Sequence, residues 1–126
     1  MSEQIKRRKF MADAGKLGAV GLFTASSYSR VLGANDRIRM GIIGSGGRGR
    51  SVMGSFLKVS PQVEFIQVCD VYEVNQNEAL KMARAGATAT YEYKEVLANK
   101  EVDAVLNATP DHWHAQIVMD AVAAGK

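Results

Sequence analysis

A glycine-rich turn carries the strongest chemical signal in this chain. Ile38–Ile43 is an apolar run typical of a buried strand, and a G-x-G-x-x-G pattern follows it directly. In that context Gly44 would allow the tight turn, Gly46 would let the backbone approach a diphosphate, and Gly49 would let helix and strand pack closely. Free N–H groups at the start of the next helix would face the diphosphate, so no lysine is required.

This pattern predicts that the turn binds the pyrophosphate of a dinucleotide. The alternative is a glycine-rich turn that only joins a strand to a helix, because glycine suits any tight turn. The predicted cofactor-binding residues of the turn are Gly44, Ser45, Gly46, Gly47, Arg48 and Gly49.

A carboxylate at the end of a second apolar run fits the same kind of site. Asp70 follows Val63–Cys69 and stands 21 positions after Gly49, where it could hold a ribose 2′-hydroxyl. A 2′-phosphate about 4 Å away would be repelled by roughly 4 kcal/mol at an effective dielectric constant of about 20. No Arg or Lys follows in Val71–Tyr72 to offset that repulsion. The sequence therefore predicts NAD rather than NADP, unless Asp70 is only a turn or capping residue.

A third polar segment follows a later apolar run, Val102–Ala108, and consists of Thr109, Pro110, Asp111, His112, Trp113 and His114. It would lie at the carboxyl end of its strand, in the crevice that the glycine turn also lines. Thr109 or Asp111 could cap the helix that follows, and Pro110 suits its first positions. Helical spacing also allows Trp113 and His114 to be core residues.

A metal site in this segment is not expected. His112 and His114 are separated by one residue, so at a helix start their side chains point about 200° apart. The single Cys69 stands in a predicted buried strand, where it would serve as a small apolar packing residue.

Strands and helices alternate along residues 35–126. Strands are expected at 38–43, 63–69, 87–91 and 102–108, and helices from about 47, at 74–85 with Asn75 as its cap, at 93–97 and at 111–124. This order predicts an α/β class, a doubly wound parallel-sheet Rossmann fold with right-handed crossovers. Four strands stand where six are usual, so the fold is expected to be incomplete at the C-terminus, and residues 35–126 alone are expected to be marginally stable.

Residues 1–34 resemble a twin-arginine export signal. Arg7-Arg8-Lys9-Phe10-Met11 precedes a small-residue apolar stretch, which is too short for a stable membrane anchor because a spanning helix needs about 20 apolar residues. The alternative is an amphipathic helix that stays on the protein. The expectation is an exported, periplasmic protein.

The charge distribution argues against nucleic-acid binding. The 126-residue chain has a net charge of +3, but residues 1–34 alone hold +4 and leave −1 for the remainder. A basic surface that could grip phosphate backbones is therefore not expected on the folded part.

Taken together, the glycine turn, Cys69–Tyr72 and Ala108–Ala115 resemble the Gfo/Idh/MocA family of dinucleotide-dependent oxidoreductases, over residues 37–126. The resemblance implies that the turn binds the pyrophosphate, that Asp70 holds the adenosine ribose, and that the segment from Thr109 to His114 lies along the ribose and nicotinamide side. Exported members with twin-arginine leaders belong to this family.

The resemblance implies no catalytic residue within this chain. The family's lysine, in an E-K-P motif, would follow Lys126, and a histidine would come from a second domain that carries substrate specificity and subunit contacts, so the full-length form is expected to be a homo-oligomer. The expected activity is hydride transfer to or from a sugar, polyol or related hydroxy compound. Two alternatives stay open, an NAD-dependent glycosidase of the same fold and a non-catalytic dinucleotide-binding module.

Overall fold

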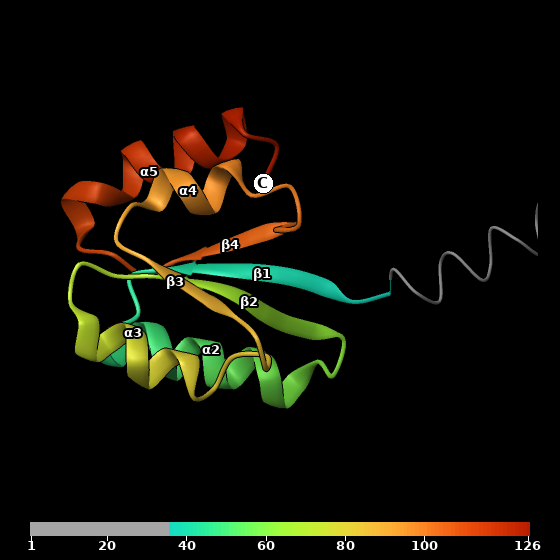
Figure 1. The fold of residues 1–126 in the computed structure, drawn as a ribbon. Helices are drawn as coiled ribbons and strands as arrows, with labels where there is room; N and C mark the ends of the chain where they lie inside the picture. The colour runs from blue at the N-terminus through green and yellow to red at the C-terminus, as the bar shows by residue number, and fades with distance from the viewer. Residues whose placement is uncertain (1–35) are drawn as a thin grey trace, which may run out of the picture. The chain divides into compact units, whose positions relative to one another are not determined.

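Four parallel strands form the centre of the fold, with two helices on each face (Figure 1). The computed structural model describes residues 36–126, and the predicted export signal, residues 1–34, lies outside them. The elements are β1 (Ile38–Ile43), α2 (Gly47–Val59), β2 (Val63–Cys69), α3 (Glu73–Leu80), β3 (Thr88–Thr90), α4 (Tyr93–Ala98), β4 (Ala104–Asn107) and α5 (Asp111–Ala123). The order in the sheet is β3-β2-β1-β4. The predicted doubly wound parallel sheet is confirmed.

The register of the sheet brings the predicted site segments to one edge. Ile43 at the end of β1 pairs with Cys69 at the end of β2 and with Asn107 at the end of β4. The residues that follow these three strands, which include the glycine turn and Asp70, therefore emerge side by side. This is the edge at which ligands bind in open parallel sheets.

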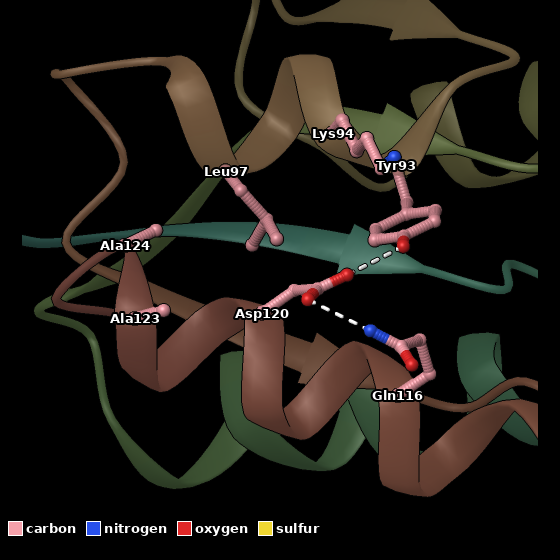
Figure 2. A pocket seen from close by; sticks show the side chains of 7 residues that line it. All are labelled: Tyr93, Lys94, Leu97, Gln116, Asp120, Ala123 and Ala124. Carbon is pink, nitrogen blue, oxygen red and sulfur yellow. Dashed lines mark hydrogen bonds between the residues drawn. The ribbon is translucent and has the colours of Figure 1, made fainter.

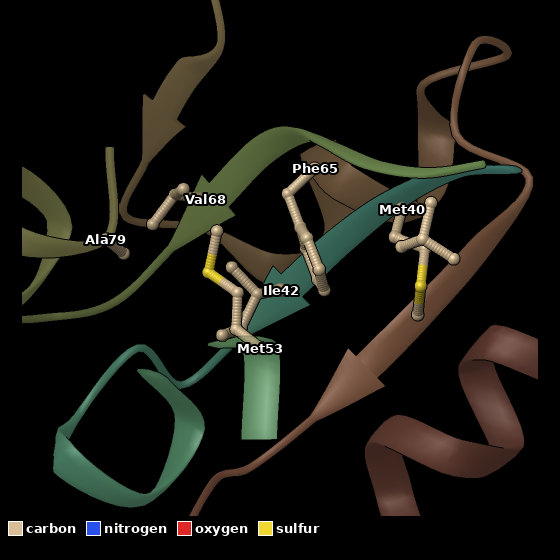
Figure 3. Packing of buried hydrophobic residues seen from close by; sticks show 7 residues of the cluster. Met40, Ile42, Met53, Phe65, Val68 and Ala79 are labelled. Carbon is tan, nitrogen blue, oxygen red and sulfur yellow. The ribbon is translucent and has the colours of Figure 1, made fainter. Parts of the chain in front are cut away.

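Apolar side chains fill both faces of the sheet, because a strand of a doubly wound sheet is covered on both sides. The face under α2 and α3 is packed by Met40, Ile42, Met53, Val63, Phe65, Val68 and Ala79 (Figure 3). The face under α4 and α5 is packed by Ile43, Cys69, Val96, Leu97, Val102, Ile117 and Ala121. Cys69 is buried, as its place in an apolar strand predicted.

The helix expected at 74–85 is much shorter than predicted. It ends at Leu80, and the chain then turns, with the N–H of Arg84 donating to the carbonyl of Phe65 at 2.9 Å. The predicted cap is wrong as well, because Tyr72 occupies the N-cap position and Asn75 lies inside the helix. Strand β4 is shorter than the expected 102–108, and β3 is shorter than 87–91.

None of the helices between residues 36 and 126 combines the length and apolar character needed to cross a membrane.

Candidate functional site

Two glycines of the predicted cofactor turn are required by the fold itself. Gly44 has a φ of +85°, and a Cβ there would lie 2.7 Å from the carbonyl oxygen of Ala108. A Cβ at Gly49 would lie 2.2 Å from the carbonyl oxygen of Gly44. These positions tie the turn to the end of β4 and let α2 begin directly against β1, as the motif predicted for tight turning and close packing.

Gly46 and Gly47 meet no such restriction. Gly46 has φ −62° and ψ −176°, a conformation that any residue adopts, and the nearest atom to a Cβ placed there is Asn75 Nδ2 at 3.9 Å. A Cβ at Gly47 would meet nothing within 4 Å. A side chain at Gly46 would therefore fit in ordinary contact with Asn75, and a side chain at Gly47 would stand in open space.

Helix α2 begins at Gly47 and no side chain caps it. Its first-turn N–H groups and the positive end of its dipole are therefore available to an anion. Arg48 is exposed on the same turn, whereas Ser45 is fully buried beneath it. The arrangement is a cradle of backbone donors around Gly46 and Gly47, of the kind that can bind an anion.

Asp70 lies directly against this turn. Its Oδ2 accepts hydrogen bonds from the Ser45 N–H at 2.7 Å and from the Ser45 hydroxyl at 3.3 Å, and its Oδ1 accepts from the Tyr72 N–H at 2.9 Å. The bond from the Tyr72 N–H is the turn role that the sequence allowed for Asp70, and the bonds from Ser45 show in addition that the carboxylate fastens the turn after β1 to the end of β2. Within residues 36–126, no Arg or Lys lies within ion-pair distance of Asp70.

Sequence reasoning missed three polar residues beside Asp70. Asn75 Nδ2 lies 3.4 Å from both carboxylate oxygens, and Asn75 Oδ1 accepts from Arg50 Nη1 at 3.1 Å. The same Arg50 nitrogen donates to the Ser45 carbonyl at 2.7 Å. The Gln76 amide donates to the carbonyl of Asp70 at 2.6 Å and is buried. The consecutive amide residues Asn75 and Gln76, shortly after Asp70, were the sequence signal that could have pointed to these contacts.

The segment after β4 is organised differently from the prediction. Pro110 occupies the N-cap position of α5 without a side-chain cap, so neither Thr109 nor Asp111 caps this helix. The Thr109 hydroxyl instead donates to Asn107 Oδ1 at 2.7 Å, and it lies 3.5 Å from His114 Nδ1. Asn107 is a further site residue that the sequence did not single out.

Thr109 and His114 are therefore connected to the edge that holds the glycine turn, while their neighbours face solvent. Trp113 is 49% exposed, which excludes the core role that its helical spacing allowed. Its ring lies 6.1 Å from that of His112, centroid to centroid, in a tilted arrangement. No side-chain hydrogen bond among residues 36–126 involves Asp111, His112 or Trp113, and no three metal-ligating side chains gather in that part of the chain.

A separate open hollow lies between α4 and the later part of α5 (Figure 2). Asp120 accepts hydrogen bonds there from the Tyr93 hydroxyl at 2.6 Å and from the Gln116 amide at 2.9 Å. The bond to Asp120, together with partial desolvation, raises the pKa of Tyr93 to about 12. None of the residues predicted to bind the cofactor lines this hollow.

Burial controls the titration of Cys69 at the end of β2. Desolvation, reinforced by the adjacent Asp70 carboxylate, raises the pKa of the Cys69 thiol to about 12. The thiol is therefore protonated at neutral pH and is a packing group rather than a nucleophile.

A glycine turn between β1 and α2, an acidic residue at the end of β2 and an open cradle at the carboxyl edge of a parallel sheet define a dinucleotide-binding Rossmann domain. The chain belongs to the Gfo/Idh/MocA oxidoreductase family, whose model, described as an oxidoreductase family with an NAD-binding Rossmann fold, matches residues 38–126. This confirms the resemblance stated from the sequence and the NAD-binding fold.

Curated relatives carry glycosidase descriptions, whereas the similar solved structures include a dehydrogenase. A glycosyl hydrolase family 109 protein of Stenotrophomonas maltophilia is 29% identical over 96% of this chain and 28% of its own length. An α-N-acetylgalactosaminidase of Shewanella oneidensis is 30% identical over 97% of this chain and 32% of its own length. The crystal structure of the WlbA dehydrogenase of Chromobacterium violaceum, in complex with NADH and UDP-GlcNAcA, is 26% identical with a TM-score of 0.63, over 71% of this chain and 25% of that one. The chain thus spans about a quarter to a third of the length of these proteins.

Proposed function

We propose that residues 38–126 are the cofactor-binding portion of an NAD-dependent oxidoreductase that transfers hydride to or from a sugar, polyol or related hydroxy compound. The observation that carries the proposal is the cradle above Gly46. Neither the backbone conformation nor the internal packing of this position needs glycine, whereas a diphosphate that approaches the backbone there does. The residues present therefore fit the cofactor that the family binds.

The preference for NAD over NADP rests on Asp70. Its carboxylate stands at the end of β2 with no cation within ion-pair distance among residues 36–126. Oδ2 already accepts from the N–H and the hydroxyl of Ser45, whereas Oδ1 accepts one short hydrogen bond, from the Tyr72 N–H, and could accept a ribose hydroxyl in place of the 3.4 Å contact with Asn75. A 2′-phosphate at that point would meet an uncompensated negative charge.

The bound cofactor would supply hydride transfer, while this chain's residues would bind and orient it. The N–H groups of the turn from Gly44 to Gly49 would hold the pyrophosphate, and Asp70 would hold the adenosine ribose. Thr109, Pro110, Asp111, His112, Trp113 and His114 would line the nicotinamide side. No residue of this chain is assigned a catalytic role.

The relatives favour one specific alternative, an NAD-dependent glycosidase. Two of them are described as glycosyl hydrolases, one of these as an α-N-acetylgalactosaminidase, and the expected substrate of that alternative is a glycoside of the same class. A dehydrogenase accumulates reduced nicotinamide in proportion to product, whereas a glycosidase that oxidises its substrate only transiently accumulates none. Measuring reduced nicotinamide and released sugar in one reaction with an N-acetylgalactosaminide therefore separates the two activities.

The leader supports a further proposal about location. Arg7-Arg8-Lys9-Phe10-Met11 and the short apolar stretch behind it favour export to the periplasm by the twin-arginine route. We expect the substrate to be a small carbohydrate-like molecule and the full-length form to be a homo-oligomer without nucleic-acid partners. Cell fractionation with and without an Arg7→Lys, Arg8→Lys double substitution tests the export proposal.

Calorimetric titration tests the cofactor proposal itself. The chain should release or absorb saturable heat with NAD⁺ and bind NADP⁺ at least about tenfold more weakly, which corresponds to about 1.4 kcal/mol. The absence of binding by either dinucleotide to folded protein would refute the proposal, and that result would leave a structural turn as the explanation of the glycines.

A further inference from the structure

Three side chains form a hydrogen-bonded series at the end of β4, and their donors and acceptors can be assigned individually. Asn107 ends the strand, Thr109 follows it, and His114 lies in the first turns of α5. Asn107 Oδ1 lies 3.3 Å from the Thr109 nitrogen and 2.7 Å from the Thr109 hydroxyl oxygen. His114 Nδ1 lies 3.5 Å from that hydroxyl oxygen and 3.2 Å from the Pro110 carbonyl oxygen.

The backbone fixes the orientation of the Asn107 amide. The Thr109 N–H can only donate, so the atom that faces it must be the acceptor Oδ1 rather than Nδ2. The opposite orientation would set two donors against each other. With Oδ1 toward Thr109, the Asn107 Nδ2 group is buried and has no hydrogen-bond partner among residues 36–126. The Thr109 N–H therefore holds Oδ1 in place even though the Nδ2 donor is left unsatisfied.

The Thr109 hydroxyl then has no proton left for His114. A threonine hydroxyl has one proton, and at 2.7 Å from an amide oxygen that proton is donated to Asn107. Toward His114, Thr109 Oγ1 can therefore only accept. The Pro110 carbonyl can also only accept, so His114 Nδ1 faces two acceptors and no donor.

We infer that Asn107 and Thr109 are positioning residues that hold neutral His114 as the Nδ1–H tautomer, so that its Nε2 lone pair accepts a hydrogen bond from a hydroxyl of the cofactor's second ribose. The tautomer of a histidine is set by the hydrogen bond that its other nitrogen makes. His114 is half-buried, and its Nε2 has no partner within residues 36–126.

The position of the ligand hydroxyl follows from the sheet order and rests on the proposed function. In β3-β2-β1-β4, Asp70 follows β2 and the Asn107–Thr109 pair follows β4, on opposite sides of β1 and its glycine turn. A dinucleotide with its adenosine ribose at Asp70 and its pyrophosphate on the turn must extend its other ribose toward β4. A Cβ on Gly44 would lie 2.8 Å from the Thr109 nitrogen, so the turn and the series are adjacent.

Nitrogen NMR of the 126-residue chain tests the tautomer without any ligand. The chain has two histidines, so a His112→Gln variant leaves the signals of His114 alone. In the neutral ring we expect Nδ1 to be protonated and Nε2 to carry the lone pair, the reverse of the preference of free histidine. Asn107→Ala frees the Thr109 proton for Nδ1 and leaves the Pro110 carbonyl, at 3.2 Å, as the acceptor that still favours Nδ1–H, so the Nε2–H population should rise above that of the parent. Asn107→Asp keeps an accepting oxygen for Thr109 and should restore the population of the parent. Signals of an Nε2–H ring in the parent, or no difference between the Ala and Asp variants, would overturn the inference.

Binding of two truncated cofactors tests the role of Nε2. ADP-ribose keeps the second ribose, whereas ADP lacks it. Asn107→Ala should weaken binding of NAD⁺ and ADP-ribose by about threefold to tenfold, the effect of one hydrogen bond, and leave ADP binding unchanged. Equal loss for ADP would indicate general damage to the fold, and no loss for ADP-ribose would indicate that Nε2 does not meet this ribose; either result would overturn the assignment. Failure of the proposed function is distinguishable, because then ADP would not bind at all.

Discussion

Asp70 should control both the stability of the glycine turn and the choice of cofactor, and two substitutions separate these effects. In the wild-type chain the buried Ser45 N–H donates to Asp70 Oδ2 at 2.7 Å, and Asp70→Ala removes this acceptor. Asp70→Asn removes the charge but keeps one oxygen that Ser45 can use. Both variants should therefore lose cofactor selectivity, but Asp70→Ala should be less stable than Asp70→Asn.

The expected magnitudes follow from these contacts. A buried N–H left without a partner costs about 1–3 kcal/mol, and in a domain of this size about 1 kcal/mol lowers the melting midpoint by about 4–8 °C. Loss of a charged hydrogen bond to the ribose should weaken NAD⁺ binding by roughly 10-fold to 100-fold in both variants. Both variants also remove the repulsion, up to roughly 4 kcal/mol, between the Asp70 carboxylate and the 2′-phosphate of NADP⁺. The preference for NAD⁺ over NADP⁺ should therefore fall by at least about tenfold.

Thermal unfolding combined with calorimetry checks both parts. Asp70→Ala should melt clearly below Asp70→Asn, while both should show the reduced ratio of NADP⁺ to NAD⁺ dissociation constants. An unchanged ratio in both variants would refute the placement of the ribose at Asp70. Equal melting midpoints for the wild-type chain and Asp70→Ala would refute its role in fastening the turn.

Further predictions concern the close packing of the turn and two shifted pKa values. Gly49→Ala places a Cβ 2.2 Å from a backbone carbonyl oxygen and should destabilise the fold by about 1–3 kcal/mol or more. At Gly47 an added Cβ meets nothing within 4 Å, so Gly47→Ala should melt at or above the wild-type midpoint. Equal melting midpoints for the two variants would contradict the close packing of Gly49. Because the pKa of Tyr93 is raised from 10.0 to about 12, its bond to Asp120 should stabilise the fold fully below pH 10 and be lost as pH rises through about 12, and the Tyr93→Phe variant should lack that transition. The chain has four tyrosines, so the absorbance of Tyr93 is taken as the difference between the wild-type chain and Tyr93→Phe; a difference that develops near pH 10 would contradict the bond. The Cys69 thiol, with a pKa of about 12, should resist alkylation at pH 8 in the folded chain and react once it is unfolded; rapid labelling of folded protein would show that Cys69 is accessible.

The strands that form the sheet centre were predictable from the sequence because their signal is local. Ile38–Ile43 and Val63–Cys69 are predominantly apolar runs, and the structure gives both the predicted bounds. The end of α3 depended on a distant contact instead. The chain leaves the helix after Leu80 and the N–H of Arg84 reaches the carbonyl of Phe65, an interaction that no local periodicity could indicate.

The candidate site divides in the same way. Spacing identified the glycines and Asp70, because a turn that binds phosphate needs small residues at fixed positions. It missed Asn75 and Asn107, since an amide side chain gains its role only from the atoms beside it. The expected cap by Thr109 was wrong for this reason, because the Asn107 oxygen takes the Thr109 hydroxyl.

The most direct test of the account is NAD⁺ binding by Gly46→Ala, measured beside its melting midpoint. The nearest atom to the added Cβ is 3.9 Å away and the backbone at this position suits any residue, so the midpoint should not fall. NAD⁺ binding should be lost, because the methyl group occupies the space that the pyrophosphate needs. Binding as tight as that of the wild-type chain, at an unchanged midpoint, would contradict the claim that this turn is the cofactor site.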